Sequence, residues 1–190
     1  MGDIIVYDIE TKETFQEVGT RDPRRLHISL LGAYSYNDNR YYSYTEDELP
    51  QFFRRLENCD LLIGFNNKGF DDQVISTYFP EISKVQSFDI LEQFHASAGF
   101  RIKLDNIAHA TLGTGKSGDG LKAISLFREG KIEELRAYCL DDVKITKEIY
   151  DFGKSAGYIK YSNIQGEREV DVNFHVKIER NETPMNLSLF

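Results

Sequence analysis

Two carboxylates lie two residues apart at the end of an apolar segment near the start of the sequence. Asp8 and Glu10 belong to the segment Ile4–Thr11, whose β-branched and aromatic residues predict a buried strand. Because strand residues two apart project from the same face, both acids point the same way. Two such charges repel each other and lose hydration, and a bridging divalent cation turns that cost into binding energy. Hard oxygen ligands suit Mg²⁺ or Mn²⁺, although the pattern also fits a strand that ends with both acids in solvent.

A third carboxylate interrupts the apolar face of a long predicted helix, Lys131–Phe152. Side chains spaced three and four residues apart share that face: Leu135, Tyr138, Asp142, Ile145, Ile149 and Phe152. Asp142 alone among them is neither apolar nor aromatic, and burying it is costly unless it is paired or metal-bound. Its neighbour Asp141 falls on the polar face, so the periodicity selects Asp142 for the interior. The alternative is a helix rotated so that Asp142 pairs with Lys or Arg at the edge of the stripe.

A further pair of acids opens a shorter predicted helix. The segment Phe70–Phe79 predicts a helix that follows the buried strand Leu61–Phe65. Asp71 and Asp72 occupy its first turn, where the helix dipole favours carboxylates with no further role. The periodicity does not separate the two, because both have apolar neighbours.

The elements around these acids predict an α/β fold. Strands Ser29–Tyr36 and Tyr41–Tyr44 follow the first strand across turn signals, and a capping box at Thr45 opens a helix that reaches about Asn58. The later elements are the strand Val85–Asp89 and the helices Ile90–Ala98, Leu104–Leu112 and Leu121–Arg128. We expect a mixed sheet of three antiparallel strands followed by two parallel ones, flanked by helices. Ligands in such sheets gather at the carboxyl ends of strands, where Asp8 and Glu10 lie.

The last part of the chain has a different pattern. We expect residues 1–156 to form one domain and residues 157–190 to form a β-hairpin and tail. The hairpin strands are predicted at Tyr158–Ser162 and Val170–Val176, and the polar end 179–190 is expected to be loose. Because a lone hairpin is marginal in water, it should dock on the domain or on a partner.

Composition restricts the function classes. The net charge of -8 over 190 residues argues against broad polyanion binding by the whole surface but permits a local basic rim. Two cysteines without metal or disulfide spacing favour a reducing, cytoplasmic location, and no signal peptide, membrane span or membrane partner is expected. The histidines lack zinc-ligand spacing. The segment Leu112–Gly118 imitates a phosphate-binding P-loop, but Ala110 stands where that motif needs glycine, so a flexible loop with Lys116 and Lys122 touching phosphates fits better.

Three segments, taken in order, resemble the exonuclease motifs of the DEDD superfamily, the DnaQ-like 3'–5' exonucleases. They are Asp8–Thr11, Gly64–Asp71 and Tyr138–Asp142. The third resembles the tyrosine version, because position 137 is alanine where the histidine version has histidine. Within that superfamily, the three segments are similar to those of the proofreading domains of family-B DNA polymerases and of helicase-associated predicted exonucleases. The resemblance spans roughly residues 1–152, implies an RNase-H-like fold, and selects Asp71 over Asp72.

The resemblance implies a 3'–5' exonuclease that hydrolyses DNA or RNA to nucleoside 5'-monophosphates with two Mg²⁺ or Mn²⁺ ions. The implied catalytic residues are Asp8, Glu10, Asp71, Tyr138 and Asp142, with the four acids holding metal and the tyrosine positioning water. The implied substrate contacts are Thr11, Asn66, Asn67, Phe70 and Lys116.

Two alternatives share the same fold. In the first, the chain is a non-catalytic module of a helicase or polymerase assembly that binds nucleic acid or acts as a scaffold. In the second, it is a structure-selective endonuclease of the RNase H type. The expected partner is nucleic acid, most favourably a single-stranded 3' end. The expected process is DNA replication or repair.

Overall fold

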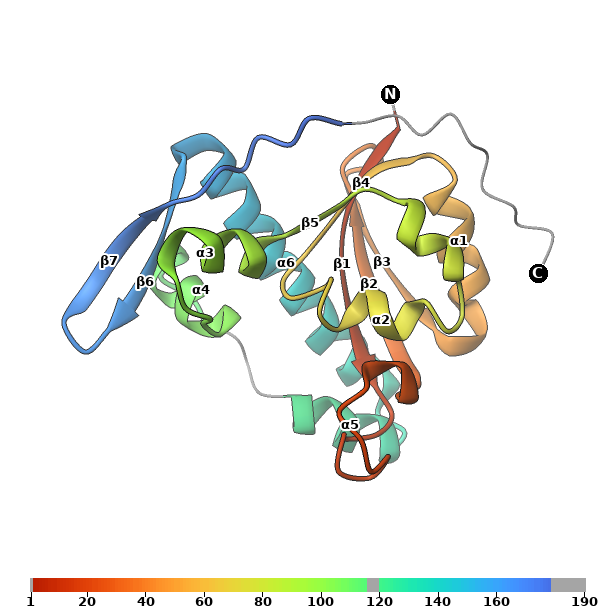
Figure 1. Ribbon diagram of the computed structural model, residues 1–190. Helices are drawn as coiled ribbons and strands as arrows, with labels where there is room; N and C mark the ends of the chain where they lie inside the picture. The colour runs from red at the N-terminus through yellow and green to blue at the C-terminus, as the bar shows by residue number, and fades with distance from the viewer. Residues whose placement is uncertain (1, 116–119, 179–190) are drawn as a thin grey trace.

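The computed structural model describes residues 2–115 and 120–178. At its centre is a mixed sheet of five strands, numbered along the chain and arranged in the order β3-β2-β1-β4-β5 (Figure 1). The strands are β1 (Asp3–Thr11), β2 (Ile28–Ser35), β3 (Arg40–Thr45), β4 (Cys59–Gly64) and β5 (Ser87–Asp89). The pairs β1–β2 and β2–β3 are antiparallel, whereas β1–β4 and β4–β5 are parallel. The predicted α/β fold is confirmed.

Helices cover both faces of this sheet. They are α1 (Leu49–Leu56), α2 (Asp71–Ile75), α3 (Ile90–Ala98), α4 (Leu104–Leu112), α5 (Gly120–Arg128) and α6 (Ile132–Ala156), with 3₁₀ turns at Pro23–Arg25, Glu46–Glu48 and Pro80–Lys84. Helices α1 and α2 lie on one face, and the long α6 crosses the other (Figure 1). Helices α3 and α4 lie beyond α6, on the side of the hairpin. In the described part of the chain, no helix is both long and apolar enough to cross a membrane.

The pleat of β1 decides which side chains meet α6. Ile5, Tyr7 and Ile9 pack into the core on the side of α1 and α2. Val6 faces the other way, into the core that includes α6. Because alternate strand residues share a face, Asp8 and Glu10 lie on one face, as predicted, and that face is the α6 side.

Helix α2 is shorter than predicted. It ends at Ile75, and a turn and the 3₁₀ segment Pro80–Lys84 replace the rest of the helix expected to reach Phe79. The Ser76 and Thr77 hydroxyls donate to the Gln73 and Val74 carbonyl oxygens at 2.7 and 2.8 Å. Such local bonds compete with continuation of the helix. The last strand of the sheet is also shorter, since β5 begins at Ser87 rather than Val85.

The hairpin consists of β6 (Tyr158–Asn163) and β7 (Gly166–Asp171), so the predicted second strand, Val170–Val176, was wrong in position. Gly166, at φ 103°, makes the tight turn, and pairing starts there with Asn163. The apolar residues Val172 and Phe174, which suggested the later strand, are buried after pairing has ended.

The hairpin docks on α4, which fulfils the expectation that it needs a partner surface. Thr111 Oγ1 lies 2.9 Å from the Lys160 amide nitrogen and 3.0 Å from its carbonyl oxygen. The side-chain amide of Asn106 makes the same pair of bonds with the Ser162 backbone, at 2.8 and 2.9 Å. The division of the chain at residue 156 stays a prediction, and the tail 179–190 lies outside the described residues.

Candidate carboxylate site

Asp8 and Glu10 meet the thiol of Cys139, a residue that the sequence did not single out. The candidate ligand atoms of these three side chains lie within 4.8 Å of one another. The Cys139 Sγ is 3.6 Å from the Asp8 carbonyl oxygen and 4.0 Å from Asp8 Oδ2. Asp8 is half-buried and Glu10 is buried. The carboxyl end of β1 and the middle of α6 therefore form one acidic cluster.

Asp142 belongs to the same neighbourhood. It is only 1 % exposed, whereas Asp141 is exposed, so burial confirms the face that periodicity selected. Burial raises the pKa of the Cys139 thiol well above its usual value, and the charges of Asp8, Glu10 and Asp142 raise it further. Three carboxylates on two elements thus act electrostatically on one buried sulfur.

Tyr138 lies one helical turn before Asp142 on the same face of α6, and it is buried. The Lys122 ammonium, from α5, lies 5.5 Å from the centre of the Tyr138 ring. The predicted catalytic tyrosine is therefore next to the predicted metal-holding acid, under a cationic side chain.

Asp71 reaches β1 from the direction of β4. Its Oδ1 accepts a hydrogen bond of 3.0 Å from the amide of Ile9, the residue between Asp8 and Glu10. The pairing of β1 with β4 ends at Val6, so Asp71 satisfies a strand amide that β4 no longer reaches. Burial raises the pKa of Asp71 to about 7; the charges of Asp72 and Asp89 add to the rise, and the Ile9 amide opposes it.

Asp72 serves a different part of the core. It accepts a hydrogen bond from the Tyr7 hydroxyl, on the face of β1 opposite to Asp8, and a long one of 3.4 Å from Ser87 Oγ. The structure therefore separates the two neighbouring acids, and it is Asp71 that lies beside the carboxylate pair of β1.

The loop before α2 is held by buried polar groups. Asn66, at φ 64°, donates its amide to Asp89 Oδ1 at 2.8 Å. Asn67 is fully buried, and its side-chain amide donates to Ser87 Oγ at 2.6 Å and to the Tyr7 hydroxyl at 3.3 Å. In this position Asn67 holds the loop from within, and its role as a substrate contact stays a prediction.

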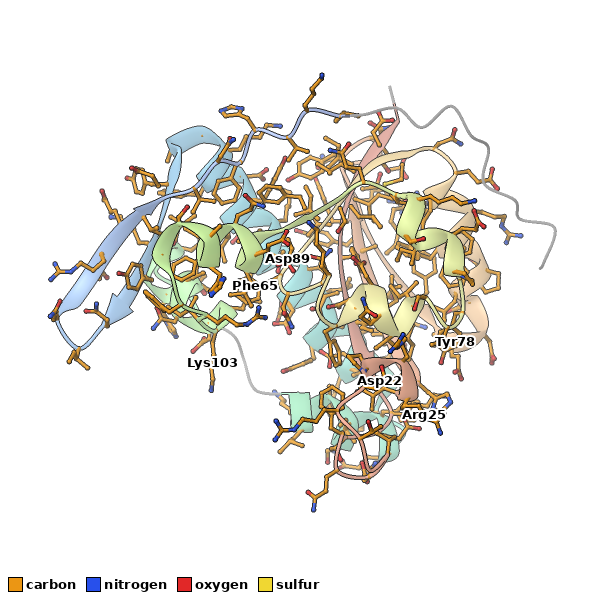
Figure 2. All side chains as sticks on the ribbon, viewed as in Figure 1. Asp22, Arg25, Phe65, Tyr78, Asp89 and Lys103 are labelled. Carbon is orange, nitrogen blue, oxygen red and sulfur yellow. The ribbon has the colours of Figure 1, made fainter. Side chains whose placement is uncertain are left out.

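Asp89 is a further residue that sequence reasoning missed. It caps α3 by accepting from the Leu91 amide at 2.9 Å while it also accepts from the Asn66 amide. Figure 2 shows Asp89 between α3 and the central strands. An aspartate immediately before a helical pattern was the available signal. Through Asn66, this cap connects α3 to the loop that precedes Asp71.

A groove of about 330 Å³ adjoins the cluster at Glu10. Its wall includes Thr11, Phe15, Phe70 and Leu121. The rings of Phe15 and Phe70 meet edge to face with centroids 5.9 Å apart. Two of the expected substrate contacts, Thr11 and Phe70, thus line one hollow, whereas Lys116 lies outside the described residues.

The donor set fits a hard divalent cation. Asp8 and Glu10 offer carboxylate oxygens, which suit Mg²⁺ and Mn²⁺. The Cys139 sulfur is the third candidate ligand atom, but sulfur is a soft donor and suits Mg²⁺ or Mn²⁺ less well than carboxylate oxygen does. The oxygens of the cluster are therefore its effective ligands.

The comparisons with known proteins decide the family. The RNase_H_2 family model, described as the RNase_H superfamily, matches residues 5–152. The chain belongs to the RNase_H superfamily. No curated protein matches the chain.

A family B DNA polymerase from the hyperthermophilic archaeon Pyrobaculum calidifontis has a similar structure. The TM-score is 0.58 at 18% identity, over 80% of this chain and 24% of the polymerase. The chain thus spans about a quarter of that polymerase's length, and at this identity the likeness concerns the fold. Membership of the RNase_H superfamily supports a nuclease-type hydrolase that acts on nucleic acid.

Proposed function

We propose that this chain is a metal-dependent 3'–5' exonuclease of the tyrosine-type DEDD group, acting on DNA or RNA. The observation that carries the proposal is the meeting of Asp8 and Glu10 with the Cys139–Asp142 turn of α6 at the carboxyl end of β1. Family membership supports nuclease chemistry, and the likeness to a family B DNA polymerase supports the fold that carries these acids.

Each acid has a role in this proposal. Asp8, Glu10 and Asp142 would hold one ion, and Asp71 together with Asp8 would hold a second. Two Mg²⁺ or Mn²⁺ ions, when bound, supply an activated water and stabilise the leaving 3'-oxygen. The bond from the Ile9 amide holds the Asp71 carboxylate at the level of the β1 acids.

The remaining groups position the reactants. The Tyr138 hydroxyl orients the attacking water, since it lies one turn from Asp142 on the same buried face. The groove beside Glu10, with Phe70 in its wall, receives the terminal nucleotide. The products are nucleoside 5'-monophosphates, and the favoured substrate is a single-stranded 3' end, within a helicase or polymerase assembly.

Digestion of end-labelled oligomers tests the proposal. DNA and RNA strands labelled at either end are incubated with Mg²⁺, Mn²⁺ or EDTA. We expect shortening from the 3' end that releases 5'-monophosphates and stops in EDTA. Cutting of a circular single strand indicates an endonuclease instead, and binding without any hydrolysis indicates a scaffold module.

A further inference from the structure

The connector between α3 and α4, residues 99–103, presents an aromatic ring supported from behind. Phe100 is 41% exposed although two buried or half-buried rings hold it in place. Its centroid lies 5.4 Å from that of Phe94 and 5.4 Å from that of Tyr161, in edge-to-face contacts. Because helix α3 and the hairpin fix the ring, its open face is a preformed surface.

Two cations follow this ring in the connector. Arg101 and Lys103 are both exposed, and within residues 2–115 and 120–178 neither forms an ion pair. The neighbouring acids already have cationic or ionisable partners, since Glu92 pairs with Lys68 at 2.6 Å and Asp105 faces His109 at 3.5 Å. In a chain of net charge -8, the connector is a local site of uncompensated positive charge.

The connector is tied to the loop that precedes Asp71. The Arg101 guanidinium donates to Asn66 Oδ1, and the Asn66 amide is in turn held by Asp89. Because this partner is a neutral amide, the positive charge of the Arg101 guanidinium stays available to an anion. Figure 2 shows Lys103 pointing away from α3 and α4, while Phe65 and Asp89 lie between these helices and the central strands.

We propose that residues 99–103 bind the nucleotides upstream of the cleaved end of an unpaired strand. Phe100 stacks on a base, and Arg101 and Lys103 contact phosphates. A base can stack on a protein ring only when it is free of its complement, so this surface selects single strands. The inference rests on the proposed function for the direction of the strand, but its binding test does not require hydrolysis.

The test measures binding of fluorescein-labelled (dT)₁₂ by anisotropy in Ca²⁺, with matched duplex as comparison. Arg101→Gln and Lys103→Gln remove charge and keep a polar side chain, whereas Phe100→Leu keeps the apolar contact but removes the ring. We expect each variant to weaken binding of (dT)₁₂ by about 3- to 10-fold. The double charge variant should lower the slope of log affinity against log salt by about 1.4, or about 0.7 for each phosphate contact.

A second aromatic and cationic hollow provides the matched control. Arg54 is exposed on α1 beside Tyr42 and Tyr44, and it has no ion pair among the described residues. Arg54→Gln should bind (dT)₁₂ like the unmodified chain. Thermal unfolding of each variant checks that the fold is kept.

The outcomes separate this inference from the proposed function. If the connector variants lose (dT)₁₂ binding but hydrolysis is absent from the unmodified chain too, the surface stands and the exonuclease proposal fails. If hydrolysis occurs but the connector variants bind (dT)₁₂ normally, the proposal that the connector binds the strand is overturned. It is also overturned if Arg54→Gln weakens binding as much as the connector variants do. A loss that is equal for duplex and single strand also overturns it, because a stacking surface discriminates between them.

Discussion

Asp8 and Gly32 are paired across strands β1 and β2, and the missing side chain at Gly32 lets α6 approach the sheet beside Asp8. A Cβ at position 32 would lie 2.9 Å from Cys139 Sγ and 3.0 Å from Val143 Cγ2. These separations are too short for ordinary van der Waals contact. Gly32 therefore sets the distance between the strand and the helix that carry the candidate metal ligands.

Replacing Gly32 by alanine should move α6 away from β1. We expect Gly32→Ala to lower the unfolding free energy by about 1–3 kcal/mol through overpacking. It should also raise the Mg²⁺ concentration needed for half-maximal hydrolysis, because the acids of the two elements separate. Titration of activity with Mg²⁺ and unfolding in urea measure the two effects.

Gly153→Ala is the control for this variant. It lies on the same helix, but an added Cβ would come within 2.2 Å of Phe174, so it should destabilise the fold at a different place. Its Mg²⁺ dependence should be that of the unmodified chain. An unchanged Mg²⁺ dependence in Gly32→Ala contradicts the role given to this glycine.

Asp142→Asn should lower kcat/KM at least about 100-fold, because it removes one charged metal ligand from the cluster. Asp141→Asn changes the adjacent but exposed residue and should leave kcat/KM within about twofold. Steady-state hydrolysis of a labelled oligonucleotide compares the two. Equal activity in both variants argues against a metal-holding role for Asp142.

Tyr138→Phe tests the positioning of water. The ring keeps its packing on α6, so the thermal unfolding midpoint should change little, whereas kcat should fall about 100-fold or more at a similar KM. A full kinetic profile against substrate concentration separates the two constants. A normal kcat would assign this tyrosine to the core alone.

The raised pKa of Asp71 predicts a pH dependence of stability in EDTA. The folded chain holds this proton with a pKa of about 7, above the ordinary 3.8, so folding favours the protonated acid. The stabilisation is complete below about pH 4 and is lost as pH rises through 7, by up to about 4 kcal/mol. Urea unfolding from pH 4 to 8 measures it.

Asp71→Asn provides the reference, because the amide oxygen still accepts from Ile9 while the titration disappears. The difference in unfolding free energy between the two proteins should change with pH over this range. Above pH 7, added Mg²⁺ should stabilise the unmodified chain more than the variant, because the variant keeps the ion held by Asp8, Glu10 and Asp142 but loses the one held by Asp71. Parallel pH profiles in EDTA would show that Asp71 does not titrate as described.

Some features of the site follow from local repetition. The alternation along Ile4–Thr11 placed Asp8 and Glu10 on one face, and the helical period of α6 separated buried Asp142 from exposed Asp141. The directions of the strands were also predictable, because short turns join antiparallel strands and helical segments join parallel ones.

Other features depend on contacts between distant segments. Asp71 and Asp72 are adjacent in one helical turn, yet one reaches the Ile9 amide and the other the Tyr7 hydroxyl, 62 and 65 residues away. Cys139 entered the cluster only because Gly32 lets α6 come close.

The sequence by itself thus determined the pleat of β1 and the buried face of α6, since these depend on periods of two and 3.6 residues that any segment displays locally. The tertiary structure alone decided which of two neighbouring acids joins the site, that a thiol lies among the carboxylates, and that Arg101 is held by Asn66. Those contacts depend on how closely the packed elements approach, which no local period contains.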